Sequence, residues 1–165
     1  MMQQLLQSLD NGELKTVTAP MPSARIGSLL IHTSVTLISS GTERMLVDFG
    51  KGSYLAKARQ QPEKVKMVLD KARTEGIAST VDAVRSKLAQ PIPLGYCNVG
   101  VVSEAGGGVE GLKAGDRVVS NGPHADVVRV GKNLCAKIPD GVSDEEAVFT
   151  VVASIGLQGL SLIHI

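Results

Sequence analysis

The spacing of apolar residues changes twice along this chain, which restricts the fold to a β domain interrupted by helices. Residues 1–43 and 91–139 contain short segments with period two, whereas residues 45–90 have the spacing of helices. Period two is typical of strands and a period near 3.6 of helices. With 165 residues, 43% of them hydrophobic, the chain is long enough to bury a core.

The first block predicts a hairpin and then a longer strand. Residues 10–12, Asp-Asn-Gly, are a turn signal between the segments Gln4–Leu9 and Glu13–Val17. After Gly27, residues 29–38 alternate so that one face is mostly apolar and the other mixed. This alternation is expected of a strand in a small barrel.

The middle block predicts two amphipathic helices. Apolar residues recur at i, i+3, i+4 and i+7 between residues 62 and 76, and at i, i+4, i+7 and i+11 over residues 77–88. Ser79 or Thr80 is expected to cap the second helix, and a shorter helix is expected over Tyr54–Ala58. The block is therefore predicted to be a helical insertion.

The third block predicts four short strands and a final helix. The strands are Gly100–Glu104, Arg117–Ser120, Ala125–Val130 and Leu134–Ile138. Gly106-Gly107-Gly108 lies between the first two without a following helix, so we interpret it as a turn rather than a phosphate-binding loop. Ser143 and Glu146 form a capping-box pattern that opens a helix through Ala147–Gln158.

Composition excludes several classes of function. The net charge is +1 and aromatic residues are 2%, so we expect no nucleic-acid partner. No apolar run has the length of a membrane span, and no secretory signal is present, so we expect a cytoplasmic protein without a membrane partner. Cys97 and Cys135, the two cysteines, build neither a disulfide framework nor a structural zinc lobe.

Several segments, taken in order, resemble one enzyme superfamily. They are residues 37–43, 93–102, 109–118 and 133–139 and the capped helix from Ser143. Together they resemble the N-terminal GroES-like catalytic domain of the medium-chain dehydrogenase/reductase superfamily, which includes the zinc alcohol dehydrogenases. The resemblance covers residues 1–159. The insertion and the run Gly95-Tyr96-Cys97-Asn98 resemble, more narrowly, the front half of bi-domain oxidoreductases.

The resemblance implies a fold class and a domain organisation. The expected fold is mainly β with helical insertions, a GroES-like partly open β-barrel over residues 1–142 that contains the insertion 45–90. Residues 143–159 are expected to be the first helix leading to a Rossmann domain beyond this chain, which would be a truncated fragment. Residues 160–165 match the translation of a sequencing adapter and are expected to be a non-native tail.

The resemblance also implies a member that works without zinc. Zinc members carry a Cys where this chain has Ser40, a His and a Glu where it has Tyr96 and Cys97, and a further Cys near Val151. Zinc needs about three nitrogen or sulfur ligands, which these side chains do not supply. No metal site is therefore predicted.

Three residues are predicted to be catalytic by this resemblance. Thr42 matches the hydroxyl that relays a proton, and Tyr96 and Ser40 would line the site as hydrogen-bond donors. Each has a structural alternative: Thr42 and Ser40 as turn hydroxyls that bond local backbone, and Tyr96 as a buried phenol bonded to backbone. Cys97 is interpreted as a small buried residue, with a thiolate nucleophile as the alternative.

Other residues are assigned to cofactor and substrate. Gly41, Thr42 and Ile155 are expected to contact the cofactor, NAD or NADP, most of which the missing domain would bind. Asn98, Asn121 and His124 are expected to face the substrate. His124 lies in a Gly-Pro turn at a strand end, where functional residues are frequent, although solvent exposure is the alternative.

The expected function is hydride transfer between NAD(P)H and a small-molecule carbonyl, alcohol or activated alkene. The fragment alone is expected to bind NAD(P) poorly and to be inactive; the intact protein is expected to form a homodimer, with a fused second oxidoreductase domain in the bi-domain case. The rival hypothesis is a non-catalytic GroES-like module that docks a partner through residues 45–90.

Overall fold

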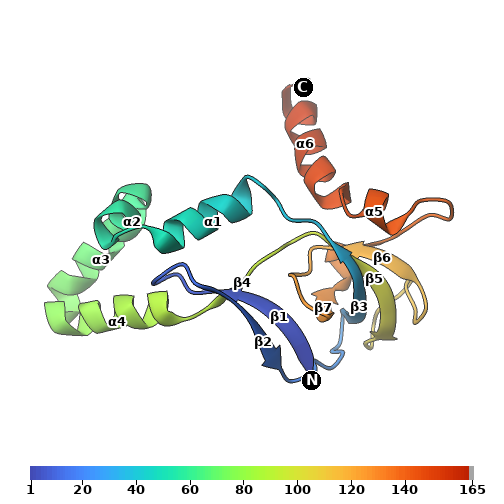
Figure 1. Cartoon of the computed structure of the whole chain (residues 1–165), viewed down its shortest axis with the longest axis horizontal. Coiled ribbons are helices and arrows are strands. Elements are labelled where there is room, and N and C mark those ends of the chain that lie inside the picture. Colours follow the sequence, from blue (N-terminus) through green and yellow to red (C-terminus); the bar gives the residue numbers. More distant parts are fainter. Residues whose placement is uncertain (164–165) are drawn as a thin grey trace. The chain divides into compact units, whose positions relative to one another are not determined.

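The computed structural model describes residues 1–163, which divide into two compact units (Figure 1). The β unit contains Met1–Leu5, Thr16–Ser39 and the chain from Pro93 onward. The helical unit contains Leu6–Lys15 and Ser40–Ile92. Each unit has its own packing and is described separately.

The β unit is built on a five-stranded antiparallel sheet with the order β7-β3-β5-β6-β8. Its strands are β3 (Ser28–Thr36), β5 (Asn98–Ala105), β6 (Arg117–Ser120), β7 (Val127–Gly131) and β8 (Cys135–Lys137), with a short 3-10 turn η1 (Lys132–Leu134) before β8. In the register, Ile31 lies opposite Val102 and Leu29 opposite Val130. These four side chains belong to one buried aliphatic cluster, so the predicted strands form the expected core.

A three-stranded sheet has the order β2-β1-β4. Its strands are β1 (Met2–Gln7), β2 (Leu14–Ala19) and β4 (Ile92–Pro93), and the chain passes from one unit to the other within each of them. The predicted hairpin is confirmed, because the Ser8 amide donates to the Glu13 carbonyl at 2.9 Å across the turn. The strands form two sheets that do not close, which confirms the expected partly open fold.

The helical unit contains α1 (Thr42–Lys51), α2 (Tyr54–Gln60), α3 (Pro62–Glu75) and α4 (Ile77–Ala89). The helices predicted from apolar spacing are α3 and α4, and the shorter one is α2. The predicted cap of α4 is wrong. Ser79 and Thr80 lie inside the first turn, where their hydroxyls donate to the Gly76 carbonyl at 3.1 and 2.8 Å, and Gly76 itself is the N-cap.

The turn between β1 and β2 anchors the first helices. Lys57 Nζ donates to the Asp10 carbonyl at 2.7 Å, and Tyr54 donates its hydroxyl to the Asp10 carboxylate at 2.6 Å. Gly12 approaches α1 so closely that a Cβ there would lie 2.5 Å from Lys51 Cγ. The glycine of the turn signal is therefore also required by the contact with α1.

The C-terminal segment forms two helices instead of the predicted single one. The capping box is confirmed, since Ser143 Oγ accepts from the Glu146 amide at 3.2 Å and the Glu146 carboxylate accepts from the Ser143 amide at 3.0 Å. It opens α5 (Asp144–Ala147), and α6 (Thr150–Ile163) begins after a turn at residues 148–149. At this turn the Phe149 amide donates to the Glu146 carbonyl at 3.3 Å, and Val148 is buried in an apolar cluster.

Of the expected tail 160–165, residues up to Ile163 belong to α6, and His164 and Ile165 lie outside the described residues. Within residues 1–163, no helix combines the length and the apolarity needed to cross a membrane.

Candidate functional site

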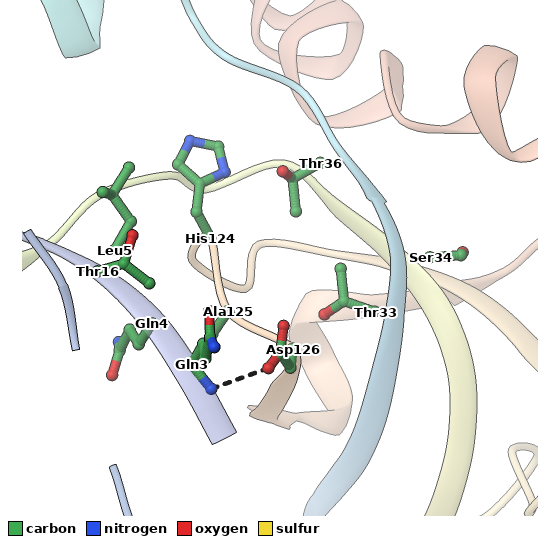
Figure 2. Close-up of a pocket in the computed structure, with 10 residues that line it drawn as sticks. All are labelled: Gln3, Gln4, Leu5, Thr16, Thr33, Ser34, Thr36, His124, Ala125 and Asp126. Carbon is green, nitrogen blue, oxygen red and sulfur yellow. Dashed lines mark hydrogen bonds between the residues drawn. The ribbon is translucent and has the colours of Figure 1, made fainter. Parts of the chain in front are cut away.

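A polar cavity of about 330 Å³ opens in the β unit (Figure 2). Side chains of β1, β2, β3 and the segment before β7 line it. Hydrogen-bonding groups dominate the lining, among them Gln3, Gln4, Thr16, Thr33, Thr36 and Asp126. His124, one of the predicted substrate residues, also lines this cavity.

His124 is held in place by backbone contacts on both sides. Its amide donates to the Leu94 carbonyl at 2.8 Å, and its carbonyl accepts from the Leu5 amide at 2.9 Å. Gly95 packs against it, because a Cβ there would lie 2.8 Å from two ring carbons of His124 and from its amide nitrogen. Only 8% of His124 is exposed, so the alternative of a solvent-exposed histidine is wrong.

Asn98 supports the cavity from behind and does not line it. The residue is fully buried, its Nδ2 donates to Thr33 Oγ1 at 2.8 Å, and its Oδ1 accepts from Ser120 Oγ at 3.4 Å. These bonds orient Thr33, which does line the cavity. Asn121, the third predicted substrate residue, is exposed outside the cavity lining.

Tyr96 and Cys97 belong to an apolar region of the β unit. Cys97 is fully buried in a cluster with Val99 and Val148, as expected for a small structural cysteine. Tyr96 is half-buried against the same cluster and is not part of the cavity lining. Ile155, a predicted cofactor contact, is 61% exposed on α6.

The residues around Cys97 do not fit a zinc ion. Val35, Leu37 and Val151 pack on the same cluster as Tyr96, so the thiol has aliphatic neighbours. Zinc requires about three nitrogen, sulfur or carboxylate ligands in a tetrahedral arrangement. Residues 1–163 contain no group of three or more His, Cys, Asp or Glu side chains arranged to hold a metal.

Ser40, Gly41 and Thr42 belong to the helical unit. Gly41 is the N-cap of α1 and Thr42 its first residue, and all three are exposed. The predicted joint role of Thr42 and Tyr96 spans the two units and stays a prediction. The burial of Glu43 was not predicted from the sequence: this residue is only 6% exposed in the first turn of α1. An acidic residue directly after a helix start was the available signal, since helix N-termini favour negative charge.

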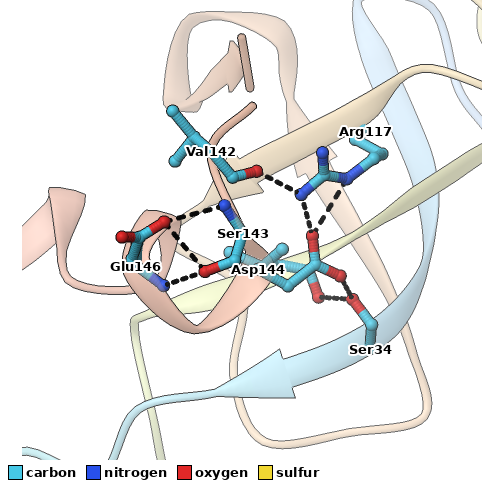
Figure 3. A network of polar contacts seen from close by, with 7 residues as sticks. Ser34, Arg117, Val142, Ser143, Asp144 and Glu146 are labelled. Carbon is cyan, nitrogen blue, oxygen red and sulfur yellow. Dashed lines mark hydrogen bonds and ion pairs between the residues drawn. The ribbon is translucent and has the colours of Figure 1, made fainter. Parts of the chain in front are cut away.

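A charged network fixes α5 to the sheet (Figure 3). Asp144 accepts from Arg117 Nε at 3.0 Å and from Ser34 Oγ at 2.6 Å, and Arg117 also donates to the Val142 carbonyl at 2.8 Å. The Ser34 hydroxyl, followed by Arg117, lowers the pKa of Asp144 below its ordinary value. Asp116, the neighbour of Arg117 in the sequence, pairs with Lys137 Nζ at 2.7 Å.

Comparison with known proteins supports the fold. No family model matches the chain. The mycobacterial protein Rv1454c complexed with NADPH superposes with a TM-score of 0.56 and 23% identity, covering 90% of this chain and 36% of that one. The quinone oxidoreductase from Coxiella burnetii gives a TM-score of 0.57 and 20% identity, covering 89% of this chain and 40% of that one.

A sequence relative covers a shorter stretch. A partially reducing polyketide synthase of Menisporopsis theobromae is 37% identical over 62 residues, which are 36% of this chain and 2% of the synthase. The chain thus spans well under half the length of each of these three proteins. The two solved structures are each under 25% identical to this chain, and about 90% of the chain shares their fold.

Proposed function

We propose that this chain is the substrate-side part of a zinc-independent NAD(P)-dependent oxidoreductase that acts on a carbonyl, an alcohol or an activated alkene. The observation that carries the proposal is the superposition of 90% of the chain on a protein whose structure contains NADPH. A homodimer, a fused second oxidoreductase domain and a cytoplasmic location belong to the same proposal for the whole protein.

The proposed site divides substrate and cofactor contacts among the predicted residues. NAD(P), when bound, supplies or accepts the hydride. Gly41, Thr42 and Ile155 fit a cofactor contact because they are exposed, and a Cβ at Gly41 would meet no atom within 4 Å. His124 would bond the substrate from the polar cavity, with Asn98 as a positioning residue behind Thr33.

The proposed chemistry uses hydrogen-bond donors where zinc enzymes use the metal. A carbonyl oxygen that gains negative charge must be stabilised by donors and then protonated. Thr42 is proposed to relay that proton, and Tyr96 and Ser40 to donate to the oxygen. Asn121, exposed beside the strand end, is proposed to contact the outer part of the substrate.

The test uses the complete polypeptide encoded at the source locus. The rates of NADH and NADPH oxidation are measured with a series of quinones, enones and aldehydes as substrates, with and without a metal chelator. The double variant Thr42→Ala, Tyr96→Phe is expected to lower kcat/KM by about 100-fold or more, the usual contribution of general acid catalysis. Thr74→Ala, which removes an exposed hydroxyl at the end of α3, is the matched control.

Robust turnover by the double variant would overturn the assigned residues. Absence of turnover in the unmodified complete protein, together with no binding of either nucleotide, would overturn the enzyme proposal itself.

A further inference from the structure

The helical unit carries an apolar groove of about 290 Å³. The lining residues come from three helices: Tyr54 of α2, Val68 of α3, and Thr80, Val81, Val84 and Arg85 of α4. Figure 1 shows α3 and α4 running beside each other within this unit. The groove is therefore formed entirely within the insertion that the sequence predicts to be helical.

Most polar groups of the groove are already bonded. The Tyr54 hydroxyl donates to Asp10 at 2.6 Å, and the Thr80 hydroxyl donates to the Gly76 carbonyl at 2.8 Å. The Tyr54 ring and the Thr80 methyl thus add to the apolar surface supplied by the three valines. Arg85 is left as the cationic group of the lining, and within residues 1–163 it takes part in no salt bridge.

Exposed apolar side chains extend this surface along both helices. Ile77, Val81, Val84 and Leu88 share one face of α4, and this stripe is about 17 Å long at the rise of an α-helix. Ile77 is 75% exposed and Leu69 of α3 is 56% exposed. None of the 14 residues of α3 is buried. A surface of this length suits about three turns of a helix better than a small ligand.

The charge around the groove selects the partner. Residues 45–90 contain nine basic and five acidic side chains. Lys71 and Arg73 are neutralised by Glu75 and Asp70 on α3, whereas Arg85 and Lys87 of α4 have no such partner in the described chain. A second copy of this unit would bring the same positive charge to the interface, so like-charge repulsion opposes self-association.

We propose that this groove docks an amphipathic helix of a partner protein, with apolar residues spaced i, i+4 and i+7 and carboxylates along its flanks. The apolar face would cover Val68, Val81 and Val84, and a carboxylate would pair with Arg85. This is recognition of a helix in a groove, in which apolar anchors supply affinity and flanking charges set register and partner choice. The proposal does not depend on the oxidoreductase function.

The test measures binding of two matched peptides to the full chain by fluorescence anisotropy. The acidic probe is an 18-residue helical peptide with leucine at the anchor positions and glutamate on its flanks. The control peptide carries lysine in place of each glutamate. We expect the acidic peptide to bind at least tenfold more tightly, and its affinity to fall as salt is raised, because the flanking contacts are screened.

Variants of the chain separate the groove from general charge. Arg85→Glu is expected to weaken binding of the acidic peptide at least tenfold. Arg129→Glu makes the same charge change on the exposed face of β7 and should change the affinity for this peptide less than twofold. Val81→Asp tests the apolar contact independently. Far-UV circular dichroism confirms that each variant stays folded.

Three outcomes would overturn the proposal. The first is that the two peptides bind equally well. The second is that Arg85→Glu leaves binding of the acidic peptide unchanged in a folded protein. The third is that only vesicles containing anionic lipid bind to the chain. The last result would assign the surface to a membrane.

Discussion

At the scale of single residues, Gly95 determines where His124 can lie. Gly95 has a φ of +92°, and a Cβ there would lie 2.8 Å from the His124 amide nitrogen. Gly95→Ala should therefore destabilise the fold by roughly 2–4 kcal/mol, through left-handed strain and overpacking.

Gly111→Ala is the matched control, because Gly111 has a φ of +80° but open space around it. This substitution should lower the free energy of unfolding by about 1–2 kcal/mol, from backbone strain alone. Urea denaturation of both variants measures the difference. Equal losses would show that the contact between Gly95 and His124 contributes nothing.

The carboxylate of Asp116 should make stability depend on acid pH. The hydrogen bond from Lys137, and then that from the Lys113 amide, lower the pKa of Asp116 below its ordinary value of 3.8. A carboxyl with a lowered folded-state pKa stabilises the fold above its unfolded-state pKa, and this contribution is lost as pH falls through the folded-state value.

Asp116→Asn removes that contribution. We expect the variant to be less stable than the unmodified chain at pH 6, and the difference to shrink as the pH falls below about 3.8. Chemical denaturation at a series of pH values from 6 to roughly 2.5 tests this expectation. A difference independent of pH would mean that the pairing of Asp116 with Lys137 does not stabilise the fold.

At the scale of elements, Asp144 joins α5 to two strands of the sheet. Asp144→Ala removes the bonds to Ser34 and Arg117, and we expect a loss of about 1–2 kcal/mol in the free energy of unfolding, since these are charged but partly exposed contacts. Asp140→Ala, at an exposed turn residue, should change stability by less than about 0.5 kcal/mol. Thermal unfolding of both variants measures these losses of stability. Equal losses in the two variants would contradict the prediction.

The elements were predictable where local spacing determines them. The strands, α3 and α4 follow from apolar periodicity, turn residues and glycine, all of which act within a few residues. The break between α5 and α6 was not predictable, because residues 148–149, Val and Phe, are not helix breakers and no glycine or proline marks the turn. Helix α1 was missed because its start, Thr42, was interpreted only through its catalytic resemblance.

The candidate site was predictable only in part, for a similar reason. The residue types of Asn98 and His124 were visible in the sequence, but the partner of Asn98 is Thr33, which lies 65 positions away. No local pattern links two such residues, so the sequence did not indicate that Asn98 acts behind the cavity wall. The packing of Gly95 on His124 likewise depends on the fold of the whole β unit.

At the scale of the whole molecule, the two units differ in how their backbone is protected. In the β unit, Leu29, Ile31, Val99 and Val102 are at most 1% exposed on the paired strands β3 and β5. In the helical unit, α3 has no buried residue. Hydrogen exchange reports local opening, and segments with few buried apolar contacts open at the lowest free energy.

Amide exchange followed by mass spectrometry should therefore distinguish the units. We expect peptides from α3 to exchange at least about tenfold faster than peptides from β3 and β5, which corresponds to a difference of about 1.4 kcal/mol in opening free energy. The acidic helical peptide should slow exchange in α3 and α4 if it docks in the groove, and leave β3 unchanged. Equal protection of α3 and β3 in the chain alone would show that something already covers the helices in solution, and a concentration dependence of that protection would identify the cover as a second copy of the chain.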